Sequence, residues 1–308
     1  MKTAIVSAAD ADFFAFLQEM LQSIEQVRPP GAKDVDLCVL DVGMTDAQRG
    51  IFGGRVTHIK DPGWDLDFPA RSRTPRVLQA MFSRPFIPRH FPGYDIYIYL
   101  DADLWLQDWK VIDVLIQVAR KNALAIVPEV HHAYASMYRQ REGAKRALHA
   151  QFGMMYESSV AQWLAAMAAQ NSGVFAMHRS CPGWTAWAED LQDALMRVDP
   201  VQPLVEQCSL NHAIYTGKVP FSPLAAKFNW ICAEALPVWD SQRNLLCDPS
   251  IPHDPLSIIH LNDLKAMPVE INCTDGSVRQ TQLTWSAIQG LKFARVRSGV
   301  SPLHTPGP

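Results

Sequence analysis

Short apolar runs alternate with helical patterns over the first 130 residues of this 308-residue chain. Runs at Thr3–Ala8, Val35–Leu40 and Asp95–Leu100 have the length and residue types of buried strands. Between the first two runs, the spacing of apolar residues over 11–25 predicts a helix. Such alternation is typical of βαβ units, whose strands form a mostly parallel sheet. We therefore predict an α/β protein.

The rest of the chain is less regular. Residues 60–73 are predicted to be a loop, 131–147 a polar, basic stretch, and the tail beyond about 271 is expected to fray. No internal repeat or linker is evident, so a single domain is favoured. The patterns also predict helices over 45–52, 75–90 (interrupted by Pro85 and Pro88), 110–121, 155–169, 183–196 and 205–216, and strands over 55–59, 123–127, 171–177 and 257–261.

Charge and cysteine usage exclude several classes of protein. Lys plus Arg total 28 against 31 Asp plus Glu, a net charge of −3, which argues against a dedicated nucleic-acid binder. No apolar run reaches the roughly 18–20 residues of a membrane span. Asp10 and Asp12 come too early for a secretory signal. The six cysteines are scattered without a C-x-x-C pair, which fits a reduced, cytoplasmic chain lacking disulfides or structural zinc.

The most informative motif is an acidic pair at the end of a strand. The apolar run Tyr97–Leu100 leads directly into Asp101 and Asp103, two residues apart. Positions i and i+2 can address one ion, and the carboxyl ends of strands are where open α/β sheets bind ligands. Mg²⁺ or Mn²⁺ typically takes one or two carboxylates plus substrate phosphates. The alternative is a pair of solvated loop aspartates.

The order of motifs around this pair resembles the GT-A class of nucleotide-sugar glycosyltransferases, specifically family 8-like enzymes. Four motifs follow one another here in the same order as in that family: Arg84-Pro85, Tyr94-Asp95, the apolar strand and the Asp-x-Asp pair. The resemblance spans about residues 3–265 and implies a Rossmann-like GT-A fold. It implies a glycosyltransferase domain over 1–270, with a nucleotide-binding half (1–130) and a sugar- and acceptor-facing half (131–270), followed by a C-terminal extension (271–308).

The resemblance assigns residues to the nucleotide. Asp10 and Phe13 fall where the family pairs an aspartate with uracil N3–H and stacks an aromatic ring on the base, beside the small Ala8 and Ala9. Asp10 could equally be a helix N-cap. Arg84 matches the arginine that contacts the donor, with Arg76 as a weaker candidate and a surface helix charge as the alternative for either.

Two further elements resemble those that line the donor sugar. Asn171-Ser172-Gly173 precedes an apolar run, and its glycine permits close backbone approach, although Asn-Ser-Gly is also a common turn. Glu206-Gln207 opens a Glu-Gln-x-x-Leu-Asn sequence in which Glu replaces the family's usual Asp. The resemblance places Gln207 near the anomeric carbon as a catalytic stabiliser and Glu206 on sugar hydroxyls. A polar helix start is the alternative for both.

The last family element departs most from the pattern. His260, after an apolar strand, matches the histidine that is the family's third protein metal ligand, with Asp101 and Asp103 as the others. Asp263 stands where glycine is expected, Lys265 comes one residue early, and the usual Pro-Trp is absent. Lys265 nevertheless matches the lysine that binds phosphate. Phe228-Asn229 is similar to a short Phe-Asn element before the last strand.

Other candidates carry weaker signals. The adjacent His131 and His132 could bind a metal, but histidine pairs on loops usually do not, so no metal is predicted there. The basic segment 139–146 could add positive field near a diphosphate. Of the nine tryptophans, most are expected in the core, although some could stack on sugars; those near the motifs are Trp105, Trp109, Trp163, Trp184, Trp187 and Trp230.

Together these features predict a metal-dependent glycosyltransferase that uses Mn²⁺ or Mg²⁺ and moves a sugar from a UDP-sugar. Asp103 would assist departure of the diphosphate through the metal. The acceptor could be a saccharide, a lipid-linked molecule or a protein, and retention of configuration is implied by the resemblance alone. A cytoplasmic location is expected, peripheral to the membrane if the acceptor is lipid-linked. The alternatives are a phosphatase-like hydrolase using Asp101 and Asp103, a nucleotidyl-transferring protein, and a non-catalytic nucleotide-sugar-binding relative.

Overall fold

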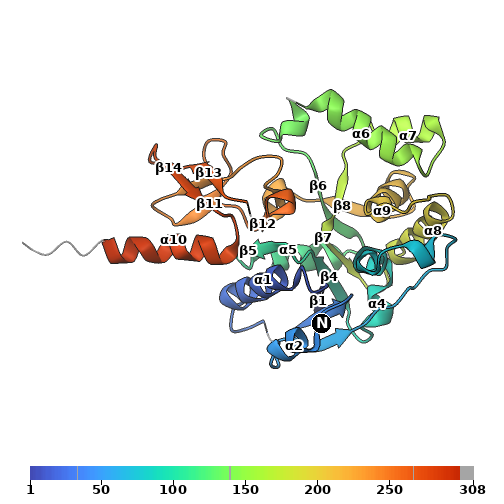
Figure 1. Cartoon of the computed structure of the whole chain (residues 1–308), viewed down its shortest axis with the longest axis horizontal. Coiled ribbons are helices and arrows are strands. Elements are labelled where there is room, and N and C mark those ends of the chain that lie inside the picture. The colour runs from blue at the N-terminus through green and yellow to red at the C-terminus, as the bar shows by residue number, and fades with distance from the viewer. Residues whose placement is uncertain (33, 139, 266, 299–308) are drawn as a thin grey trace, which may run out of the picture.

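A seven-stranded, mostly parallel sheet forms the centre of the protein in the computed structural model (Figure 1). The structure describes residues 1–32, 34–138, 140–265 and 267–298, with the backbone alone for 293–298. All strands run parallel except β7, which is antiparallel to both of its neighbours. The order across the sheet is β3 (His58–Lys60), β2 (Val35–Asp41), β1 (Thr3–Ala9), β4 (Ile96–Leu100), β7 (Gln170–His178), β6 (Leu124–Pro128) and β8 (Phe221–Pro223).

Helices cover both faces of this sheet. Because side chains alternate along a strand, Ile5 and Ile98 pack on one face against α1 (Phe14–Val27) and α5 (Lys110–Ala119). Tyr97 and Phe175 pack on the other face. The helices there are α4 (Ile87–His90), α8 (Gly183–Leu195) and α9 (Val205–Tyr215). The predicted α/β class, with a mostly parallel sheet flanked by helices, is confirmed.

A second, three-stranded sheet lies beside the end of β4. Its order is β5 (Leu104–Leu106), β12 (Ile258–His260) and β9 (Trp230–Ile231). β5 starts directly after the Asp-x-Asp motif. The strand that hydrogen-bonds to β5 is therefore brought next to the two aspartates. β12 runs antiparallel to β5, with His260 opposite Leu104. This pairing joins the late histidine to the acidic motif.

The predicted elements agree with the structure in part. Residues 75–90 are helical and interrupted, as predicted, and they form short α and 3₁₀ helices in place of one continuous helix. The stretch 131–147, expected to be a polar segment, contains most of a helix. Residues 71–90 form η1 (Arg71–Arg73), η2 (Arg76–Leu78), α3 (Gln79–Phe82), η3 (Arg84–Phe86) and α4. The other helix in the first half of the chain is α2 (Asp46–Ile51). After β6 come η4 (Ala135–Met137), α6 (Arg141–Gly153) and α7 (Ser158–Leu164).

The expectation that the chain frays beyond about residue 271 is wrong for the described residues up to 298. β13 (Val269–Asn272) and β14 (Val278–Thr281) form a hairpin, and α10 (Trp285–Ser298) follows. Ile271, Leu283 and Ile288 are buried in a separate apolar cluster that also holds Trp105 and Trp239, so this part of the chain is packed. Residues 299–308 lie outside the described residues. The remaining elements lie between β8 and β13; they are η5 (Ala226–Phe228), β10 (Val238–Asp240), β11 (Leu245–Cys247) and η6 (Asn262–Leu264).

Candidate functional site

Asp101, Asp103 and His260 converge at the carboxyl end of β4. His260 Nε2 lies 3.4 Å from Asp103 Oδ1 and 3.9 Å from Asp101 Oδ2. One ligand atom from each of the three residues lies within 4.8 Å of the others. β4 delivers the two aspartates and β12 delivers the histidine, so the sheet register creates the cluster. Two carboxylates and an imidazole suit Mn²⁺ or Mg²⁺, so the donor set fits the predicted ion.

A hydrogen-bond chain orients the histidine toward the aspartates. His260 Nδ1 is 2.8 Å from Asn229 Oδ1, and Asn229 donates in turn to Asn171 Oδ1 at 2.9 Å. Because an amide oxygen can only accept, Nδ1 carries a proton, and Nε2 is the ring nitrogen that faces the two aspartates. Support of this kind behind a ligating imidazole is typical of metal sites. Asn229, predicted only as part of a Phe-Asn element, is thereby assigned a supporting position.

Gly173 leaves the space in which the cluster sits. Its carbonyl accepts the backbone N–H of Asp101 at 2.8 Å, so the two chains are in direct contact. A Cβ at this position would collide with Asp101 Oδ2 and would lie 2.8 Å from His260 Cε1. The glycine is therefore required by close approach to the cluster, whereas its predicted place beside the donor sugar stays a prediction.

Lys265 lies against the acidic pair. Its Nζ is 2.9 Å from Asp103 Oδ2 and 5.2 Å from the centre of the Phe13 ring. Burial alone would raise the pKa of Asp103, but the charges of His260 and Lys265 hold this pKa well below its usual value. Asp103 is thus ionised, the form that can ligate a cation. The lysine reaches the site although it comes one residue early.

Arg84 is buried between two carboxylates. Its Nη2 donates to Asp101 Oδ1 at 2.5 Å, and its Nη1 donates to Glu206 Oε2 at 2.8 Å and to Ser172 Oγ at 2.7 Å. The guanidinium also lies over the Tyr99 ring, 4.6 Å from its centre. Burial would lower the pKa of Arg84, but the two carboxylates raise it above its ordinary value. A fixed positive charge therefore sits beside Asp101.

The start of α9 brings Glu206 and Gln207 to the same place. Burial raises the pKa of Glu206 from 4.5 to about 7, against the lowering effect of Arg84. Gln207 Oε1 accepts the backbone N–H of Ser172 at 3.0 Å. Both predicted residues therefore lie next to the Asn-Ser-Gly element. Glu206 Oε2 accepts hydrogen bonds from Arg84 and Ser172. Glu206 therefore has fewer acceptor positions left for a sugar hydroxyl than the resemblance implies.

Glu129 is a carboxylate that sequence reasoning missed. Its Oε1 accepts from Asn171 Nδ2 at 2.8 Å and from Gln207 Nε2 at 3.3 Å. Burial raises the pKa of Glu129, although both amides act against the shift. It follows the predicted strand at 123–127, as Asp101 follows β4. The rule that acids after strand ends gather at one sheet edge could have identified it.

Asp10 and Phe13 line a small cavity that reaches the acidic pair. The cavity has a volume of about 70 Å³. Asp10 Oδ1 accepts the backbone N–H groups of Asp12 and Phe13, at 3.1 and 3.0 Å. Asp10 therefore holds the turn before α1, whose N-cap position is Phe13 without a side-chain cap hydrogen bond, so the N-cap alternative for Asp10 is wrong. Its place in the turn is compatible with a place in the cavity. The other residues of its wall include Ala8, Ala9, Val77, Met81, Arg84, Tyr99, Asp101 and Asp103.

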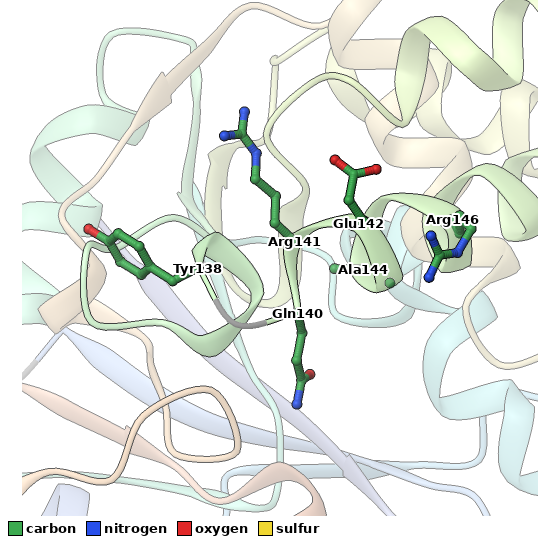
Figure 2. A pocket seen from close by; sticks show the side chains of 7 residues that line it. Tyr138, Gln140, Arg141, Glu142, Ala144 and Arg146 are labelled. Atoms are coloured by element: carbon green, nitrogen blue, oxygen red, sulfur yellow. The ribbon is translucent and has the colours of Figure 1, made fainter.

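Other candidates lie elsewhere. Arg76 is exposed and ion-paired with Asp61 at 2.7 Å, so it does not join the cluster. The basic segment 139–146 starts at Arg139, which lies outside the described residues. The rest of it borders an open hollow at the start of α6, where Arg141 and Glu142 point one way and Gln140 the opposite way (Figure 2). Since these side chains do not converge, the hollow forms no site. Of the tryptophans near the motifs, Trp105, Trp109, Trp184, Trp187 and Trp230 are buried and Trp163 is exposed.

No known protein-family profile matches the sequence, and no curated protein sequence matches it. Solved structures do. A galactosyltransferase, LgtC, in complex with donor and acceptor sugar analogs is 19% identical over 75% of this chain and 76% of that chain, with a TM-score of 0.48. A bifunctional glycosyltransferase, WbbM, is 15% identical over 75% of this chain and 39% of that one, with a TM-score of 0.50. The glycosyltransferase GlyE of Streptococcus pneumoniae TIGR4 is 18% identical over 74% and 46%, with a TM-score of 0.44.

The protein has the fold of GT-A glycosyltransferases. The likeness to WbbM supports it, and so do the strand order and the flanking helices described above. The predicted GT-A architecture is confirmed at the level of the fold. Among the described residues, no helix combines the length and apolar character that crossing a membrane requires.

Proposed function

We propose that this protein is a metal-dependent glycosyltransferase that moves a sugar from a UDP-sugar to an acceptor. The observation that carries this proposal is the convergence of Asp101, Asp103 and His260 at the carboxyl end of β4. Asp103 is held ionised and His260 presents Nε2 to it. The GT-A fold supports the same class of activity. The retaining stereochemistry rests on the family resemblance alone.

The cluster would hold Mn²⁺ or Mg²⁺. A bound cation supplies Lewis-acid stabilisation of the charge that develops on a departing diphosphate. Lys265, which forms an ion pair with Asp103, would bind a phosphate oxygen beside the two aspartates. Arg84 balances Asp101 and Glu206 and fixes both. Charges held in place before the reaction are usually a large part of catalysis.

The donor would extend from the cavity to the start of α9. Phe13 offers a ring on which the base can stack. Asp10 uses Oδ1 to accept the N–H groups of the turn, which leaves Oδ2 for a hydrogen bond with the base. A carboxylate that accepts from uracil N3–H would favour uridine over cytidine. At the other end, Glu129 holds the amide of Gln207, whose oxygen is turned to Ser172. Gln207 would thus face the sugar in one fixed orientation. The acceptor is a saccharide, a lipid-linked molecule or a protein.

An assay of UDP release tests this proposal. Wild-type protein is titrated with Mn²⁺ in the presence of a panel of UDP-sugars, alongside Asp103→Asn and the exposed control Asp12→Asn. We expect release to require Mn²⁺ and to fall on the order of 100-fold in Asp103→Asn alone. Undiminished release in that variant would refute the metal role. Hydrolysis of a generic phosphate ester without UDP binding would favour the phosphatase-like alternative.

A further inference from the structure

His131, His132 and Asp248 form a second group of metal-binding side chains, on the loop after β6 and the loop after β11. One ligand atom from each lies within 4.8 Å of the others. His131 Nε2 is 3.0 Å from Asp248 Oδ2, and the two imidazole rings are 4.1 Å apart at their centres. Two nitrogens and a carboxylate oxygen on one Zn²⁺ would lie about 3.3 Å apart, given ligand distances near 2.0–2.1 Å. The observed spacing needs only small side-chain adjustments.

The two loops hold these side chains in place. The His131 ring packs edge-on against the buried Trp230, with centroids 4.9 Å apart. Asp248 Oδ1 accepts the backbone N–H of Ser250 at 2.8 Å, which turns Oδ2 toward His131. The Asp248 N–H donates to the Asp254 carbonyl at 2.9 Å, so the second loop is closed on itself. Both partners are therefore fixed before any cation arrives.

We propose that His131, His132 and Asp248 bind one Zn²⁺ ion, at a site separate from the Asp-x-Asp cluster. Two imidazoles and one carboxylate suit Zn²⁺, whereas two carboxylates and one imidazole suit Mn²⁺ or Mg²⁺. The two sites are thus chemically distinct. With three protein ligands, the ion keeps an open fourth position, which water or the nearby Ser250 hydroxyl can fill; that hydroxyl is 2.5 Å from His132 Nε2.

Binding exchanges two hydrogen bonds of His131 for ligand bonds. His131 Nδ1 accepts the Ala133 N–H at 3.2 Å, so Nε2 carries the ring proton and donates it to Asp248. The cation takes the place of that proton at Nε2, and the proton moves to Nδ1. No proton is lost from the ring. The contact with Ala133 and the hydrogen bond from Nε2 to Asp248 are lost, and ligand bonds from His131, His132 and Asp248 form.

The consequence concerns the candidate active site. Glu129, which holds Asn171 and Gln207, lies two residues before His131. An ion shared by the two loops would tie this segment to the C-terminal part of the protein and restrict the movement of Glu129. The role of the zinc would be to hold the two loops together, away from the donor.

Zinc binding by the full-length, untagged protein tests the proposal without any assay of transfer. EDTA-treated protein is dialysed against Zn²⁺ alone, and bound metal is counted for wild type, Asp248→Asn, His132→Gln and the same-loop control Asp254→Asn. We expect Asp248→Asn and His132→Gln each to lose one zinc equivalent, or to bind it at least about 10-fold more weakly. Asp254→Asn should match wild type.

Zinc should also raise the melting temperature of wild type and Asp254→Asn more than that of the two ligand variants. Melting without zinc shows whether each variant folds, and the exposed His132 gives a substitution that leaves the contact between His131 and Trp230 intact. Equal zinc binding by all four proteins would overturn the proposal. So would a wild type whose bound zinc disappears entirely in Asp103→Asn. Neither outcome depends on UDP or sugar transfer.

Discussion

Gly173 connects the backbone of β7 to the metal-binding side chains. Any Cβ there would collide with Asp101 Oδ2 and crowd His260. The observed dihedral does not demand glycine, because Gly173 is not among the glycines with positive φ. The requirement is therefore steric, and it arises from the ligand cluster itself.

Gly173→Ala should accordingly weaken Mn²⁺ binding by about 10-fold or more, since it displaces two ligands. Calorimetric titration with Mn²⁺ measures this. The control is Gly153→Ala on α6, where a Cβ meets nothing within 4 Å. Unchanged Mn²⁺ affinity in Gly173→Ala would show that Asp101 and His260 do not form the site.

Glu206 gives a prediction in pH. It ionises near 4.5 when unfolded and near 7 when folded, because burial raises its pKa. Between these values the folded state binds more protons, so the contribution of Glu206 to stability is greatest below about pH 4.5 and falls as pH rises to 7. The loss amounts to about 3 kcal/mol at most.

Urea unfolding of wild type and Glu206→Gln from pH 4.5 to 8 isolates this contribution. The stability difference between the two proteins should shift in favour of Glu206→Gln as pH rises. A difference independent of pH would mean that Arg84 keeps Glu206 ionised throughout, with no raised pKa.

At the scale of elements, the segment from η2 to α3 narrows the nucleotide side of the site. Val77 and Met81 line the same cavity as Asp10 and Phe13. The cavity of about 70 Å³ is smaller than the roughly 300–1,000 Å³ of typical ligand pockets. A nucleotide therefore requires this segment to move or to leave its base partly exposed.

Met81→Trp should fill the cavity and weaken UDP binding by at least about 10-fold, which is 1.4 kcal/mol. Mn²⁺ binding should persist, since the substitution lies outside the ligand cluster. The control is Met154→Trp, at an exposed position directly after α6. UDP affinity unchanged by Met81→Trp would place the base elsewhere than in this cavity.

Local patterns predicted the elements that carry the site better than those that surround it. The strand before Asp101 and the strand before His260 were predicted, because short apolar runs bounded by polar residues are a strong signal. The helix at 141–153 was missed, since its residues are largely polar and exposed. The packed hairpin and α10 were missed because their burial comes from contacts with distant segments such as Trp105.

At the scale of the whole molecule, the site is assembled from segments far apart in sequence. The residue types were readable one by one, but distances such as that from Glu129 to Gln207 depend on how β6, β7 and α9 pack. Lys265 shows the same limit. Its shifted position in the motif left its role open, and the turn at η6 brings its Nζ to Asp103.

The central claim is that Asp101, Asp103 and His260 hold a cation that in turn binds a nucleoside diphosphate. Calorimetric titration with UDP, with and without Mn²⁺, tests it most directly on wild type, Asp103→Asn and Asp12→Asn. The account predicts that Mn²⁺ strengthens UDP binding at least about 10-fold in wild type and Asp12→Asn, and that the gain disappears in Asp103→Asn. Equal UDP affinity with and without Mn²⁺, or a gain that survives in Asp103→Asn, would contradict it.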